Sequence, residues 1–322
     1  MPNRSVNVCA LLLLLLCGVA LAQTGQPEIG ESAQERQARS ARFQAGVERA
    51  AALLEKDPRL GQLSPEQRKQ DVEFVSGNLL FATLHEMGHA HIQEMGLYVL
   101  GREEDAADSY AVTTLLKTGT DVSHNMLIYA AEGWFLSALR DQKENIPLAF
   151  YDEHGMDKQR AYQIICLMVG SDPDAFSDLA NLAKMPEDRQ QSCAGDYSNA
   201  IWSWQTALKP HLRAPDAPKQ KLTINYGAAG DYPDIAAAMR ASGALEIVAE
   251  TEAARYVWRR PMRFDVKSCG QPDLHWDLQT QTILVCYEMA EDFGQLYRFY
   301  GVTNDAFKAA IAQLGGMGKQ KK

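Results

Sequence analysis

Apolar residues recur at helical spacing along the chain from residue 32 to about residue 212. Ser64, Pro65 and Gln67 form a capping signal, which predicts a helix that begins here and ends near Gly96. Its apolar positions keep helical spacing up to Met87, so we expect a long, buried helix. The same pattern predicts further helices over residues 32–56, 102–117, 122–142, 171–185 and 198–212, and one entered from a loop within 152–170.

The pattern changes after the prolines at 210, 215 and 218. The segments KLTINYG (221–227) and MRFDVKSC (262–269) alternate between apolar and polar residues, as strands do. QTILVCYE (281–288) is expected to form a third strand that leads into a helix. DLHWDLQT, just before the third segment, is typical of a turn, and a helix is expected over 287–300. The sequence therefore predicts an α+β fold, in which a mainly helical part carries a smaller C-terminal α/β part with a short sheet.

The start of the chain has the features of a secretory signal peptide. Arg4 supplies a positive charge, Val8 to Val19 is almost continuously apolar, and Ala20-Leu21-Ala22 gives a small-x-small cleavage pattern. The apolar run is too short to span a bilayer comfortably, so we expect removal and no stable membrane insertion afterwards. The mature protein would be secreted, and periplasmic in a Gram-negative bacterium.

These boundaries suggest four segments along the chain. We expect a signal peptide over 1–22, a leader and helix over 23–60, a helical domain over 61–215, and an α/β segment over 219–322 packed on it. The net charge is −9 and no basic patch stands out in the sequence. Both observations disfavour nucleic acid or an anionic membrane surface as a partner.

Four cysteines follow the predicted signal peptide, and an even number in an oxidising compartment suggests two disulfides. Three pairings are possible. We favour the local one, Cys166–Cys193 with Cys269–Cys286, because each pair falls within one supersecondary unit. A four-thiolate zinc site is the alternative, but the sequence has no CxxC spacing to support it.

The segment LHEMGHAHIQEMG (84–96) carries the clearest chemical signal in the chain. Residues four apart on a helix lie about 40° apart around its axis, so His85 and His89 can bind one metal ion. Glu86 lies about 100° from His85, where its carboxylate can act on a metal-bound water as a general base. His91 is rotated by about 200° from His89 and is expected to point away from the ion.

A catalytic zinc site keeps three protein ligands and one open position, so a third ligand must come from elsewhere. GREEDAADSYA (101–111) concentrates acids, and Glu104 and Asp108 share one helical face. We predict that Glu104 binds the metal and that Asp108 hydrogen-bonds a ligand histidine. Glu103 or Asp105 could take the ligand role instead.

These motifs resemble those of known metallopeptidases. HEMGH followed by Glu104-x-x-x-Asp108 is similar to the gluzincin pattern, in which a Glu ligand and a supporting Asp share a helix. HEMGHAHIQEMGLYVLGREEDAAD, YDEHGMDKQRAYQIICLMVGSDP and the later Cys269-Gly270…Cys286-Tyr287-Glu288 resemble a bacterial family of metallopeptidases of unknown function. The resemblance covers roughly residues 70–300. It implies Zn²⁺ on His85, His89 and Glu104, with Glu86 as general base.

A second polar cluster, DEHGMDKQR (152–160), can supply a group that stabilises the oxyanion of a tetrahedral intermediate. His154, oriented by Asp152 or Asp157, is the best candidate for this catalytic role, and Arg160 is a second. The alternative is structural: Asp157 caps the following helix and Arg160 forms a salt bridge.

The sequence thus predicts a secreted zinc metallopeptidase whose metal-activated water attacks a peptide or protein substrate, with Glu86 as the general base. Two alternatives remain open. One is a non-catalytic zinc-containing envelope protein, which the presence of Glu86 disfavours. The other is a zinc hydrolase that acts on a non-peptide amide such as a cell-wall component.

Overall fold

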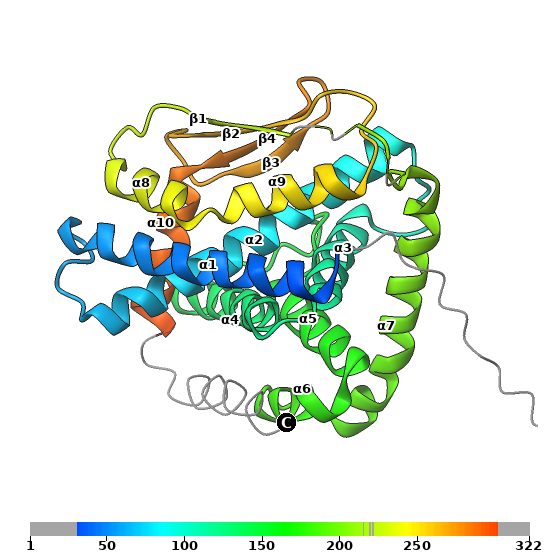
Figure 1. Cartoon of the computed structure of the whole chain (residues 1–322). Coiled ribbons are helices and arrows are strands. Elements are labelled where there is room, and N and C mark those ends of the chain that lie inside the picture. Colours follow the sequence, from blue (N-terminus) through cyan, green and yellow to red (C-terminus); the bar gives the residue numbers. More distant parts are fainter. Residues whose placement is uncertain (1–30, 215, 219, 221, 302–322) are drawn as a thin grey trace, which may run out of the picture.

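A computed structural model describes residues 31–214, 216–218, 220 and 222–301. The predicted signal peptide and nearly all of the leader lie outside these residues. Helices form the lower layer of the molecule in Figure 1, and a small sheet with its own helices lies above them. The predicted α+β class is confirmed. Among the described residues, no helix has the length and apolar character needed to cross a membrane.

The helical layer is built around α2 (Pro65–Met95), which the sequence predicted closely. Ser64 caps its start by accepting a hydrogen bond from the Gln67 backbone N–H, and Gly96 ends it with a left-handed φ of 67°. The other helices of this layer are α1 (Ala33–Leu53), α3 (Glu103–Thr118), α4 (Asp121–Glu144), α5 (Asp157–Ser171), α6 (Pro173–Leu182) and α7 (Glu187–Leu208).

The last helix of this layer begins earlier than expected. The sequence predicted a helix over 198–212, whereas α7 already begins at Glu187, after Pro186. The polar residues of its first turns hid its helical period. The helix ends at Leu208, and residues 209–211 form a short 3₁₀ turn that contains Pro210.

The upper layer holds a four-stranded mixed sheet with the strand order β1-β2-β4-β3. β1 (Thr223–Tyr226), β2 (Arg263–Lys267) and β4 (Thr282–Cys286) are parallel, and they match the three predicted strands. β3 (Leu274–Asp277) pairs antiparallel with β4 at one edge. The expectation of a turn over 273–280 was therefore wrong for residues 274–277. So short a strand is held extended by its pairing with β4, which the local sequence does not indicate.

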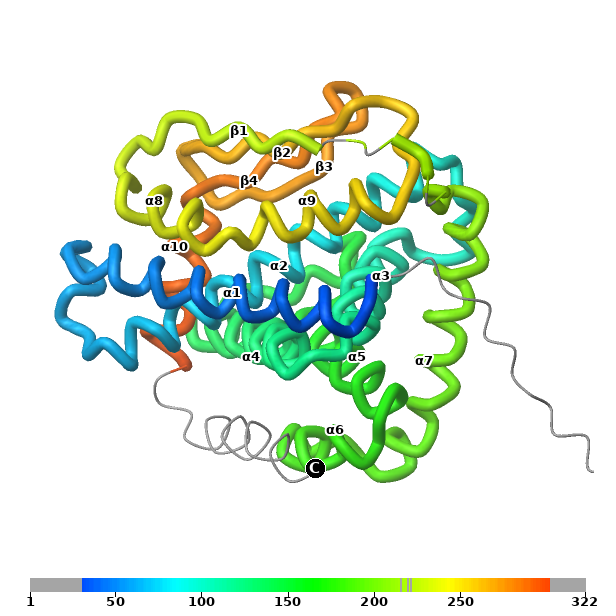
Figure 2. The backbone as a smooth tube through the Cα atoms, in the orientation of Figure 1, coloured from blue at the N-terminus to red at the C-terminus, as the bar shows by residue number. Residues whose placement is uncertain are grey.

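The sheet is linked to the helical layer by α8 (Pro233–Ser242), α9 (Ala244–Arg255) and α10 (Tyr287–Leu296), and a π-helical turn (Tyr297–Gly301) follows. The sequence pattern did not predict α8 and α9. Figure 2 shows α1 lying alongside them, although 179 residues separate α1 from α8. The division into a 61–215 domain and a 219–322 segment remains a prediction.

Both disulfides have the local pairing. Cys166–Cys193 joins α5 to α7, and Cys269–Cys286 joins the segment after β2 to the end of β4. The second bridge holds the loop that leads into β3. Because its cysteines are bonded to each other, their proximity to Glu288 does not make a metal site.

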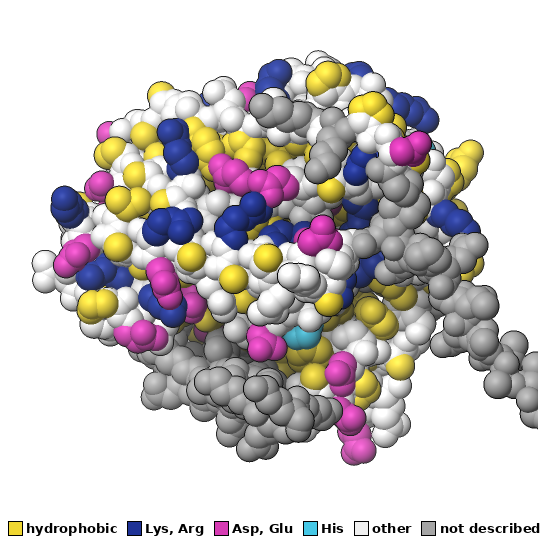
Figure 3. All heavy atoms as spheres, viewed as in Figure 1, with side chains coloured by type: hydrophobic (Ala, Val, Ile, Leu, Met, Phe, Trp, Pro, Cys, Tyr) yellow, Lys and Arg dark blue, Asp and Glu magenta, His cyan; other side chains and the backbone are white. Residues whose placement is uncertain are grey.

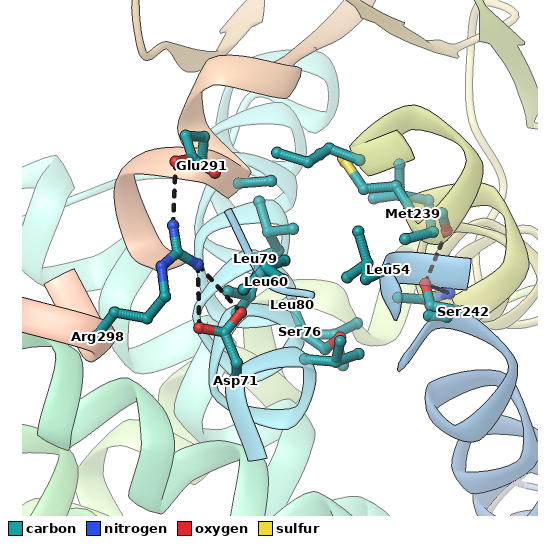
Figure 4. Close-up of a pocket in the computed structure, with 18 residues that line it drawn as sticks. Leu54, Leu60, Asp71, Ser76, Leu79, Leu80, Met239, Ser242, Glu291 and Arg298 are labelled. Atoms are coloured by element: carbon teal, nitrogen blue, oxygen red, sulfur yellow. Dashed lines mark hydrogen bonds and ion pairs between the residues drawn. The ribbon is translucent and has the colours of Figure 1, made fainter. Parts of the chain in front are cut away.

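A small cavity of about 50 Å³ lies between α1, α2, α8 and α10 (Figure 4). Most of its wall is apolar, and at one end Arg298 bridges the carboxylates of Asp71 and Glu291. Burial raises the pKa of Asp71 to about 6, against the opposing effect of Arg298. The cavity is far smaller than the several hundred Å³ of an ordinary ligand site, so it is a packing void.

Candidate metal centre

The α2 and α3 helices approach each other closely at Gly88. A Cβ at this position would lie 2.9 Å from the Cα of Ala107 and 3.3 Å from the Cβ of Tyr110. No side chain fits at that separation, so glycine is required for the two helices to pack this way. The approach brings the face of α2 that carries His85 and His89 against the first turns of α3.

Three potential ligand atoms converge where these helices meet. The Nε2 atoms of His85 and His89 lie 3.1 Å apart. The Oε2 atom of Glu104 lies 3.0 Å from Nε2 of His85 and 3.3 Å from Nε2 of His89. The structure therefore brings together the three residues that the sequence predicts as metal ligands.

The spacing of these atoms suits a zinc ion. A tetrahedral site with metal–ligand bonds of about 2.0–2.1 Å has edges of about 3.3–3.4 Å. The three separations of 3.0–3.3 Å come close to that value without any rearrangement of the helices. Two imidazoles and one carboxylate are also a donor set that zinc accepts.

His85 is oriented by a buried chain of charged groups. Its Nδ1 lies 2.7 Å from Oδ1 of Asp108, as predicted. Arg160 donates two hydrogen bonds to Asp108, from Nε at 2.8 Å and from Nη2 at 2.6 Å. The guanidinium also lies over the ring of Trp134, 3.7 Å from its centroid. Arg160 thus orients Asp108 through a salt bridge, which is the structural role predicted as the alternative for this residue.

Glu103 and Asp105, the alternative ligands, have other partners. Glu103 Oε1 lies 2.8 Å from Nδ1 of His89, on the far side of the ring from the Nε2 that faces Glu104. Asp105 is exposed and pairs with Arg102 at 3.0 Å. Each histidine of the pair therefore has one nitrogen facing Glu104 and the other facing a second carboxylate, an arrangement typical of metal-binding histidines.

The carboxylates around these histidines change their protonation. Burial alone would lower the pKa of His89, but hydrogen bonds to Glu104 and Glu103 outweigh it and raise the pKa to about 9. The pKa of His85 is raised in the same way by Asp108 and Glu104, against burial. Burial would raise the pKa of Glu104, but hydrogen bonds from His154, His85 and His89 hold it far below its usual range. The surrounding carboxylates therefore favour positive charge on or between the two imidazole rings.

His154 lies on the accessible side of this cluster. Its Nε2 is 2.8 Å from Oε2 of Glu104, and its Nδ1 is 3.1 Å from Oδ1 of Asp152. Of the two acids expected to orient it, Asp152 does so, whereas Asp157 is the first residue of α5. His85, Glu104 and His154 form a second group that can hold a metal ion, besides the group of His85, Glu86 and His89.

Glu86 has a partner that the sequence did not reveal. Its Oε2 accepts a hydrogen bond of 2.8 Å from the backbone N–H of Trp276 on the edge strand β3. Burial raises the pKa of Glu86, against the lowering effects of His85, His89 and this N–H. The indole Nε1–H of Trp276 donates to Gln93 on α2 at 3.1 Å. The sheet is thereby linked to the same helix that carries the histidines.

His91 faces away from the metal cluster, as predicted, and is fully buried. Its Nε2 lies 2.9 Å from Oε2 of Glu252 on α9 and 2.9 Å from the hydroxyl of Tyr110 on α3. Tyr110 in turn donates to Oε1 of Glu252 at 2.7 Å. This network joins α9 to the rear of α2 and α3, and Glu252 is a partner that no local sequence pattern indicated.

Residues 49–208 match the model of a protein family described as "Putative metallopeptidase". The match covers just under half of the 322 residues and extends from the end of α1 to the end of α7. It includes Glu86, His154 and the three convergent ligands, but not Trp276. No curated protein and no solved structure matches the chain. The chain is thus similar to a family of metal-dependent peptidases in the region that builds the metal cluster.

The close approach at Gly88 leads to a test of the metal centre. Gly88→Ala should push α3 away from α2 and lower zinc affinity by roughly tenfold or more, a loss comparable with removing an outer-shell partner. Gly195→Ala is the control, because Gly195 lies in α7 with nothing within 4 Å of its Cβ position. Competition titration with a zinc chelator measures both variants. Equal zinc affinity of Gly88→Ala and the wild type would contradict the account.

Proposed function

We propose that this protein is a zinc-dependent peptidase in which His85, His89 and Glu104 hold the metal and Glu86 is the general base. The observation that carries the proposal is the convergence of the three ligand atoms within 3.0–3.3 Å of one another. The partners of His85 and His89 support it, because Asp108 and Glu103 fix the two imidazole rings from behind.

When bound, zinc acts as a Lewis acid that polarises a carbonyl and makes water a stronger nucleophile near neutral pH. Glu86 takes the proton of the attacking water and returns it to the leaving amine. The Trp276 N–H binds Oε2 of Glu86 and leaves Oε1 available for that proton. The raised pKa of Glu86 suits it to hold the proton between the two steps.

His154 is the proposed donor to the oxyanion of the tetrahedral intermediate. Its side chain is partly exposed, at 39%, and its Nε2 lies 2.8 Å from Oε2 of Glu104. In the proposed step the Nε2–H exchanges this carboxylate for the oxyanion of the substrate. The hydrogen bond to Glu104 raises the pKa of His154 against burial, which keeps the ring in its donating form. Asp152 fixes the other ring nitrogen.

The proposed substrate is a peptide or protein, in keeping with the family likeness. We propose that the protein works outside the cytoplasm, as a secreted or periplasmic enzyme. The two disulfides support this location, because such bonds persist in oxidising compartments.

The three neighbouring acids of α3 give a matched test of the ligand set. Glu104→Ala should lower zinc affinity by on the order of a hundredfold or more, because a ligand is lost. Glu103→Ala should lower zinc affinity by about 10- to 100-fold, because the His89 ring loses the partner that orients it. Asp105→Ala should leave zinc affinity unchanged. Chelator competition measures all three. If Asp105→Ala weakens zinc binding as much as Glu104→Ala does, the assignment is wrong.

Glu86→Gln should bind zinc like the wild type and lose turnover by about 10²- to 10⁴-fold, because the amide still accepts the Trp276 N–H but cannot carry a proton. Cleavage of a diverse peptide library, read by mass spectrometry, and the zinc content of each preparation measure the two effects. A Glu86→Gln protein that retained wild-type turnover would exclude Glu86 as the base.

The role of the Trp276 N–H can be separated from that of the indole ring. Trp276→Ala keeps the N–H, whereas Trp276→Pro removes it. The Cys286 N–H donates to the Asp273 carbonyl, so alternation along β3 turns the Trp276 N–H away from β4, and its loss spares that pairing. Compared with Trp276→Ala, Trp276→Pro should lower kcat by roughly 10- to 100-fold, with a smaller change in KM and unchanged zinc content. Steady-state kinetics on one cleaved peptide give this comparison. Equal kcat for the two variants would show that the hydrogen bond plays no part.

A further inference from the structure

Two loops that lead into the metal cluster carry large apolar side chains exposed to solvent. The first loop, residues 97–102, joins α2 to α3, and the second, residues 145–156, joins α4 to α5. Phe150 exposes 77% of its surface, and Tyr98, Leu100 and Tyr151 expose more. Ile146 and Leu148 of the second loop are exposed as well. None of these side chains contributes to the hydrophobic core.

Both loops end at residues of the cluster. The first loop runs directly into Glu103 and Glu104, and the second contains His154. The loops also meet each other, because the Arg102 guanidinium lies 3.6 Å from the Cβ position of Gly155. The exposed side chains are therefore carried by the two segments that border the accessible side of the proposed catalytic site.

Exposed apolar side chains of this size indicate a surface that another molecule covers. Exposed apolar surface beside a site marks a place where another molecule binds. Loops that surround a rigid site are also where specificity resides. Charge does not mark a comparable site on the face shown in Figure 3, where positive and negative side chains are interspersed.

Charge favours one occupant over the others. In these loops and in the first turns of the helices that follow them, the acids outnumber the cations: Asp105, Asp152 and Glu153 are exposed and Glu103 is partly exposed, against the exposed cations Arg102 and Lys158. These negative charges oppose docking onto an anionic lipid surface. A polypeptide with apolar side chains meets no such repulsion, and it is the class of molecule that a peptidase must hold across its metal.

The geometry points to a substrate class: the two loops bind large apolar side chains that lie close to the bond to be cut. This inference rests on the proposed peptidase function. Large apolar side chains are mostly buried in folded proteins. A site that selects them therefore acts on unfolded or flexible polypeptide segments, rather than on the surfaces of folded domains.

The test uses two loop variants, Tyr98→Ser with Leu100→Ser, and Phe150→Ser with Tyr151→Ser. Phe299→Ser is the matched control, because Phe299 is also exposed, at 71%. It follows Arg298, which pairs with Asp71 near the start of α2. Asp71 precedes His85 by fourteen residues, which is about 21 Å along the helix. The substrates are synthetic peptides tiled over the sequence of casein, and copies in which Ser replaces each large apolar residue.

Wild type should cut next to large apolar residues, and each loop variant should lower kcat/KM on these peptides by roughly tenfold or more. Phe299→Ser should match the wild type, and all variants should retain zinc. Cleavage with no preference for apolar residues, or loop variants with wild-type kcat/KM, would overturn the inference and leave the peptidase function intact.

Binding separates this inference from the proposed function. Zinc-loaded Glu86→Gln should bind the apolar casein peptides more tightly than their Ser copies, and the loop substitutions made in that background should remove the difference, as measured by fluorescence anisotropy. If wild type cleaves no peptide while this binding persists, the proposed peptidase function is wrong, and the inference that the loops bind apolar side chains is kept. Loop-dependent binding to phosphatidylglycerol vesicles without peptide binding would overturn the inference in favour of a membrane surface.

Discussion

The metal cluster depends on the close contact between α2 and α3 at Gly88 and Ala107. α2 presents His85 and His89, and α3 presents Glu104 and Asp108. Every separation that makes these groups a metal-binding set is a distance between the two helices or within one of them. Because helices are stiff and packed interiors leave little free space, this contact constrains the separations within the cluster around it.

Charge satisfaction explains why so many polar groups surround that contact. A buried charge without a partner costs several kcal/mol, so each carboxylate near the histidines needs a donor. Asp108 receives two hydrogen bonds from Arg160, and Glu86 receives one from the Trp276 N–H. These partners come from α5 and β3, while Glu252 reaches the rear of α2 from α9. The C-terminal part of the chain, outside the family match, thus supports the site from two sides.

Much of the fold and half of the site follow from local sequence rules. The caps of α2 and the i, i+4 spacing of its histidines are local, so both could be predicted. The choice among Glu103, Glu104 and Asp105 is different, because neighbouring residues differ by about 100° around a helix and the outcome depends on how α3 turns toward α2. The partners Trp276 and Glu252 lie 190 and 161 residues away from Glu86 and His91. Such contacts arise from tertiary packing, and β3 itself is extended only through its pairing with β4.

The most direct measurement is the position of zinc in a crystal of the zinc-loaded protein, located by anomalous scattering at the zinc absorption edge. The account predicts one strong peak bonded to Nε2 of His85, Nε2 of His89 and Oε2 of Glu104, with the carboxylate of Glu86 beside it and not bonded to it. A peak ligated by Glu86, a peak that leaves Glu104 unbound, or zinc bound elsewhere in the chain would contradict the account.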